Sequence, residues 1–121
     1  MSKFRHPDAV TNNRDKLKKV YPEIAKAYER VSLEQYELFA GKMLDYGKGN
    51  ISVGSNLDTE EEVHVAMTVL WFRINDKINR LKQLVLLRKD ANVKTESIKD
   101  TFQDLSIYGI IAQIVGNGKW K

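Results

Sequence analysis

The sequence contains no cysteine, only two prolines and only two histidines. Without cysteine, neither disulfides nor thiolate chemistry is available, and an intracellular setting is the natural expectation. His6 and His64 stand alone in the chain, so they form no zinc-ligand spacing and support no serine or cysteine triad. Neither a Walker pattern nor a GxGxxG motif occurs, which excludes the phosphate-loop enzymes of those kinds.

Long apolar runs are also absent. The longest, 69–72 and 84–87, are far shorter than the roughly 20 residues that cross a bilayer, so we expect no membrane partner. The first eight residues lack the apolar centre of a signal peptide, and we therefore expect a cytoplasmic protein.

The formal net charge is +4, which suggests an anionic partner. Nucleic acid binding would require a concentrated basic face with aromatic platforms, whereas here acids and bases are interspersed. A phosphorylated small molecule suits this charge balance, and nucleic acid is not the expected partner.

Apolar residues recur at helical spacing, and no segment alternates as a strand does. The sequence therefore predicts an all-α fold, a small helical bundle. Residues 1–30 form an N-terminal helical arm, and residues 31–121 form the main region of a single domain. The expected helices lie near residues 22–30, 33–45, 60–88 and 96–115, and the last three supply the core.

Several polar residues are suited to start these helices. Ser32 is a predicted N-cap, and Thr59 with Glu62 forms a predicted capping box. Thr95 or Ser97 is expected to cap the last helix.

Glycines mark two helix ends. The segment 45–50 contains two of them, and it predicts either a helix C-cap or a loop that brings backbone N–H groups and Lys48 to a phosphate. Gly116-Asn117-Gly118 ends the last helix, after which Trp120 folds back onto the bundle or packs on a partner.

The long helix near residues 60–88 has apolar residues on more than one side, which indicates a dimer. One side carries Val63, Leu70, Ile74, Ile78, Leu81 and Val85, and the rest of the circumference carries Trp71, Phe72, Leu84 and Leu87.

Two carboxylates continue an apolar stripe on the last helix. Asp100, Asp104, Ile107 and Ile111 share one line at 100° per residue, so both acids are expected to be half-buried. A buried carboxylate needs a facing cation, which is either an arginine or lysine or a divalent metal. The pattern alone leaves both alternatives open.

Cations on the long helix can complete such a site. Arg73, Lys77 and Arg80 align at i, i+4 and i+7, and Asp76 can either pair with Arg80 or join the acids. Oxygen ligands with few histidines favour Mg²⁺ or Mn²⁺, with the cations and Lys48 holding phosphates. A metal-bound water can then attack a phosphoanhydride.

Three blocks of sequence resemble the nucleotide-modification-associated domain family, which is small and frequent in bacteriophages. The blocks are Lys42-x-x-Asp45-Tyr46-Gly47-x-x-Asn50, Arg73-x-x-Asp76-Lys77-x-x-Arg80 and Asp100-x-x-x-Asp104-Leu-x-x-Tyr108-x-Ile-Ile-Ala112. The resemblance covers about residues 33–118. It implies a phage-type nucleotide protein, placed in the host cytoplasm if a phage encodes it.

Residues 104–112 are more distantly similar to the last metal-binding helix of the MazG-like all-α nucleoside triphosphate pyrophosphohydrolases. Those enzymes hold Mg²⁺ with acids on facing helices, split the α–β phosphate bond and work as dimers or tetramers. The resemblance therefore implies a homodimer or homotetramer. Their Glu-Glu-x-x-Glu helix corresponds at best to Arg73-x-x-Asp76 here.

Three functions follow as hypotheses. The first is a Mg²⁺-dependent (deoxy)nucleoside triphosphate pyrophosphohydrolase, in which Asp100 and Asp104 are catalytic and bind metal with Asp76. Lys48, Arg73, Lys77 and Arg80 would hold phosphates there, and Asp45, Tyr46 and Asn50 would contact base or sugar. The second is a non-catalytic nucleotide or signal-molecule binder, such as a phage sponge. The third is a helical adaptor in which Asp100 and Asp104 pair with Arg73 and Arg80.

Overall fold

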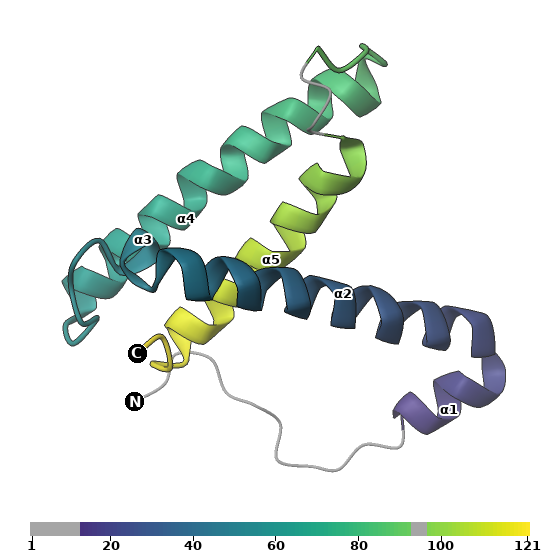
Figure 1. Cartoon of the computed structure of the whole chain (residues 1–121), viewed down its shortest axis with the longest axis horizontal. Helices are drawn as coiled ribbons and strands as arrows, with labels where there is room; N and C mark the ends of the chain where they lie inside the picture. The colour runs from purple at the N-terminus through teal and green to yellow at the C-terminus, as the bar shows by residue number, and fades with distance from the viewer. Residues whose placement is uncertain (1–12, 93–96) are drawn as a thin grey trace. The chain divides into compact units, whose positions relative to one another are not determined.

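The computed structural model describes residues 13–92 and 97–121. Within these residues the elements are helical and no strand occurs, which confirms the all-α class. Their order is α1 (Asn13–Val20), α2 (Pro22–Tyr46), α3 (Gly49–Ser52), α4 (Glu60–Leu81), the π-helix η1 (Lys82–Leu86) and α5 (Ile98–Gly116) (Figure 1). None of the helices in these ranges has the length and hydrophobicity required to span a bilayer.

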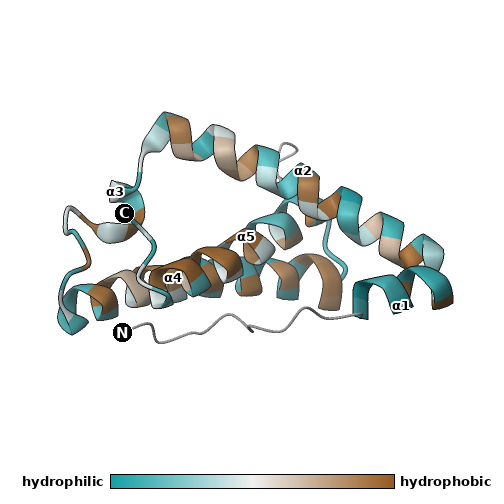
Figure 2. Cartoon of the chain, turned by 90° about the horizontal axis from the view of Figure 1, so that it is seen from below, coloured by the Kyte–Doolittle hydropathy of each residue, from teal (hydrophilic) through white to brown (hydrophobic). Residues whose placement is uncertain are grey.

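The chain divides into two units near Asp45, and each is described by itself. The first contains α1, which is largely hydrophilic (Figure 2), and α2. Tyr21 N donates to Leu17 O at 2.7 Å, and Pro22 occupies the first position of α2, where its missing N–H costs little. An exposed ion pair joins Lys18 Nζ to Glu29 Oε1 at 3.2 Å.

α2 is one helix of 25 residues, so the prediction of separate helices near 22–30 and 33–45 was wrong. Ser32 lies inside it and is not an N-cap, because no proline or glycine interrupts the helix there and serine costs only a few tenths of a kcal/mol in a helix interior. Leu33 and Leu44 of this helix are 70% and 88% exposed.

The second unit contains α3, α4 and α5. α5 returns along α4 in the opposite direction (Figure 1), and the two helices share a core. Its buried apolar residues include Ala66 and Leu70 on α4 and Ile107, Ile111 and Val115 on α5. Both predicted helices, near 60–88 and near 96–115, are therefore confirmed in type and approximate extent.

The prediction of which side of α4 packs in the core was wrong in part. Ile78 is 52% exposed and Val85 is 43% exposed, whereas Leu70 is buried. The face against α5 is centred on Ala66 and Leu70, and Ile78 lies about 80° around the helix from Leu70.

Residues close in the sequence determine where α4 begins and where α5 begins and ends. The capping box of Thr59 and Glu62 is confirmed, and Ser97 is the N-cap of α5, whereas Thr95 lies outside the described residues. α5 ends at Gly116, and Gly118 at φ +72° allows Lys119 N to donate to Ile114 O at 3.1 Å. This turn returns Trp120, which is 6% exposed, to the unit and confirms that it folds back.

Candidate functional site

The three predicted cations of α4 lie along one side of the helix. Arg73 and Arg80 are seven residues apart, which is about 10 Å along the axis. Between them, Lys77 Nζ lies 3.0 Å from Asp104 Oδ2, and the two side chains are 24% and 22% exposed. Asp104 is half-buried as predicted, and the cation facing it is Lys77 from the neighbouring helix.

Asp100 has a local partner at the start of α5. Its Oδ2 accepts a hydrogen bond from Ser97 N at 3.1 Å, and its own N–H donates to Ser97 Oγ at 3.1 Å. This reciprocal pair is a capping box, in which an aspartate takes the place of the usual glutamate. The Ser-x-x-Asp spacing at 97–100 is the sequence signal for this capping box, beyond the predicted Thr95 or Ser97 cap.

In the segment after α2, the backbone carbonyl oxygens of Lys48 and Asn50 accept hydrogen bonds from side chains far away in the sequence. Arg73 Nη2 donates to Asn50 O at 2.9 Å, and Lys48 O accepts from Trp120 Nε1 at 3.1 Å. The short helix α3 follows directly, and its first turn also uses Lys48 O as the acceptor for Ser52 N at 3.2 Å.

Three other predicted site residues are exposed. Asp45 belongs to the unit of α1 and α2, Tyr46 is 72% exposed at the end of α2, and Asp76 is exposed on α4. Across residues 13–92 and 97–121, no three histidine, aspartate or glutamate side chains converge as a ligand set for a metal. A site for Mg²⁺ or Mn²⁺ stays a prediction.

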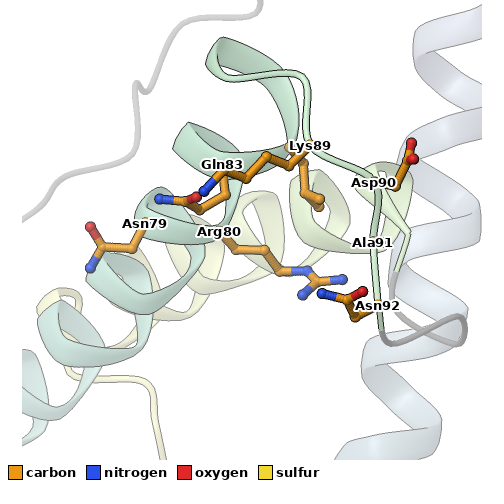
Figure 3. A pocket seen from close by; sticks show the side chains of 8 residues that line it. Asn79, Arg80, Gln83, Lys89, Asp90, Ala91 and Asn92 are labelled. Carbon is orange, nitrogen blue, oxygen red and sulfur yellow. The ribbon is translucent and has the colours of Figure 1, made fainter.

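A pocket of about 500 Å³ opens where α4 ends, on the side of Arg80 (Figure 3). In Figure 3 the Arg80 guanidinium points toward the segment that carries Asn92. Of the lining residues, only Arg80 was predicted as a binding residue. The others come from the end of the helix and from a segment predicted only as a polar turn. The lining consists of Asn79, Arg80, Gln83, Leu84, Lys89, Asp90, Ala91 and Asn92.

The backbone at the end of α4 explains how these residues meet. In η1 the hydrogen bonds span five residues, as from Leu87 N to Lys82 O at 3.0 Å. Arg88 then adopts φ +53°, and Lys89 N donates to Gln83 O at 3.0 Å. A left-handed residue at a helix end reverses the chain, so residues 89–92 come back beside Arg80. Such π-type turns are frequent at functional sites.

The lining of the pocket combines charged and amide side chains with an apolar base. Leu84 is buried, and Arg80 and Lys89 bring two positive charges against the one negative charge of Asp90. Asn79, Gln83 and Asn92 add amides that each offer both donors and an acceptor. The arrangement can bind an anion with its cations and orient a polar group with its amides, and its volume lies within the range of small-molecule sites.

Comparison of the chain with family models, with curated proteins and with solved structures gave no match. The resemblance to the nucleotide-modification-associated domain family and to the MazG-like enzymes therefore stays a prediction.

Proposed function

We propose that this protein binds a nucleotide or a closely related phosphorylated small molecule in the pocket at the end of α4. Arg80 and Lys89 contact phosphate oxygens, and arginine is suited to them because its planar guanidinium gives two parallel hydrogen bonds. The amides of Asn79, Gln83 and Asn92 contact the base or the sugar. The observation that carries the proposal is Arg80 in a pocket of about 500 Å³ with a second cation and three amides.

The chemistry of the lining favours a small phosphorylated ligand over a polynucleotide. Among the residues that the structure describes, the lining contains two cations and no aromatic residue on which successive bases can stack. The rest of the cationic side of α4 supports the same class of ligand, because Arg73 and Lys77 extend it by about 10 Å from Arg80.

Binding without catalysis is the form of this function that the contacts favour. Asp104 faces Lys77 and Asp100 caps α5, so neither acid is held in a ligand set with Asp76. The Mg²⁺-dependent pyrophosphohydrolase stays a prediction, in which the metal would arrive with the phosphates and Asp104 would be one of its few protein ligands.

Calorimetric titration with a panel of nucleoside triphosphates, with and without Mg²⁺, tests the proposal. The wild-type chain is expected to bind at least one of them, and Arg80→Ala to weaken the affinity by roughly ten-fold or more, because hydrogen bonds to charged groups contribute about 1.5 to 3 kcal/mol. Arg30→Ala is the matched control, since it removes the same charge from an exposed position on α2.

Equal affinities for wild type and Arg80→Ala would show that the ligand does not use this pocket. Measuring pyrophosphate release in the same samples separates the two forms of the function. Binding without release supports the binder, whereas release that depends on Mg²⁺ and is lost in Asp104→Asn supports the enzyme.

A further inference from the structure

The end of α4 lacks the residue types that usually end a helix. Residues 82–89 contain no glycine, proline, asparagine or serine, and arginine is nearly as favourable as alanine in a helix interior. The local sequence therefore favours a straight α-helix that continues beyond Leu81. The structure instead has the π-turn of η1 there, and residues 88–92 are not helical.

Arg88 adopts the left-handed conformation that glycine adopts after two other helices. Gly47 follows α2 at φ +73° and Gly118 follows α5 at φ +72°, whereas Arg88 follows η1 at φ +53°. A Cβ makes this conformation costly, so arginine is poorly suited to it and well suited to a continuing helix. The local sequence and the structure thus disagree at Arg88, and such disagreements are frequent at functional sites.

The turn at Arg88 forms one wall of the pocket. Lys89 N donates to Gln83 O at 3.0 Å, which brings residues 89–92 back beside Arg80 (Figure 3). In a straight α-helix the same N–H would donate to Val85 O, and residues 89–92 would continue along the axis away from Arg80. Of the lining residues that the structure describes, four come from this segment, so the pocket depends on the turn.

We propose that the end of α4 exchanges between this turned form and a straight α-helix, and that Arg88 is the positioning residue that sets the balance. Only the turned form contains the wall of residues 89–92, so a nucleotide that contacts this wall and Arg80 shifts the balance toward it. The inference rests on the proposed function for its ligand and adds regulation to the same pocket. The apparent affinity is the intrinsic affinity reduced by the fraction of chains in the turned form.

Two variants of Arg88 separate the effect of its backbone from the effect of its charge. Both Arg88→Gly and Arg88→Ala remove the guanidinium, but glycine favours the left-handed conformation and alanine favours the helix. In calorimetry with a nucleoside triphosphate that binds the wild type, Arg88→Gly is expected to bind roughly five-fold more tightly than Arg88→Ala, or better.

Val53→Gly is the matched control. Val53 follows α3 at φ +54°, and it is 57% exposed and absent from the described lining of the pocket. Glycine there relieves the same backbone conformation at another helix end, so the affinity for the nucleotide is expected to stay unchanged.

The ¹³Cα chemical shifts of residues 89–92 in the ligand-free proteins give a second measurement. They are expected to move toward helical values in Arg88→Ala and away from them in Arg88→Gly. Equal shifts or equal affinities in these two variants overturn the proposal, and so does a gain in affinity in Val53→Gly as large as that in Arg88→Gly. If no nucleotide binds the wild type, the proposed function fails, and the shifts alone decide whether Arg88 sets the balance.

Discussion

The two sides of α4 differ in chemistry although their residues alternate in the sequence. Arg73 and Arg80 lie on one side, with the pocket at the end of the helix, and Trp71 and Ile78 lie on the other, where they are 59% and 52% exposed. Between the two sides, Leu70 is buried against α5. A cationic side, a core face and an exposed apolar side therefore share one helix, and substitutions two residues apart are expected to change different properties. The predictions below test this separation.

The core between the two sides is expected to give the largest effect on stability. Leu70→Ala removes a side chain that is 1% exposed, and it should lower the free energy of unfolding by about 2 to 5 kcal/mol. Leu86→Ala is the matched control, because Leu86 is 75% exposed in η1, and it should change stability by less than about 0.5 kcal/mol. Urea unfolding followed by circular dichroism measures both. Similar losses in the two variants would contradict the assigned core.

The ion pair between α4 and α5 should give an intermediate effect. Asp104→Asn leaves Lys77 half-buried without its partner at 3.0 Å, and it should cost about 1 to 3 kcal/mol. Asp76→Asn changes an exposed acid on α4 and should be nearly neutral.

Thermal unfolding of the metal-free protein decides what Asp104 does. If Asp104 belonged instead to a cluster of acids awaiting a metal, Asp104→Asn would stabilise the protein by relieving repulsion. A rise in Tm would therefore contradict the structural pair, and a fall in Tm with no change in Asp76→Asn would support it.

The cap of α5 should give the smallest effect of the three. Ser97→Ala removes the acceptor for Asp100 N, and it should cost about 0.5 to 2 kcal/mol. Asp100→Ala removes the acceptor for the backbone N–H of residue 97, which Ser97→Ala retains, so it should add a further loss of similar size in the Ser97→Ala background. A loss in urea unfolding of the double variant well above these two cap contributions would show that Asp100 has a further role.

The elements that could be predicted from the sequence are those specified by local chemistry. Thr59 with Glu62 begins α4, and Gly118 ends α5, because each depends only on residues within one turn. Ser32 shows the limit of such reasoning, since a residue that suits an N-cap also fits inside a helix when nothing interrupts it.

The candidate site was predictable only in part, because its residues meet through the backbone. The spacing of Arg80 from Arg73 and Lys77 predicted it as a binding residue. No sequence pattern predicted Lys89 and Asn92, because they reach the pocket only through the π-turn of η1 and the positive φ of Arg88. Similarly, the pattern showed that Asp104 requires a cation, but only the packing of α5 on α4 selects Lys77.

The most direct test of the central claim is an NMR titration of the ¹⁵N-labelled chain with ATP or another nucleoside triphosphate that binds in calorimetry. The separation of the two sides of α4 predicts that amide shifts change at residues 79–92, around Arg80, and stay unchanged at Trp71 and Ile78 on the opposite side. Changes confined to Trp71 and Ile78, or no changes at any nucleotide concentration, would contradict it.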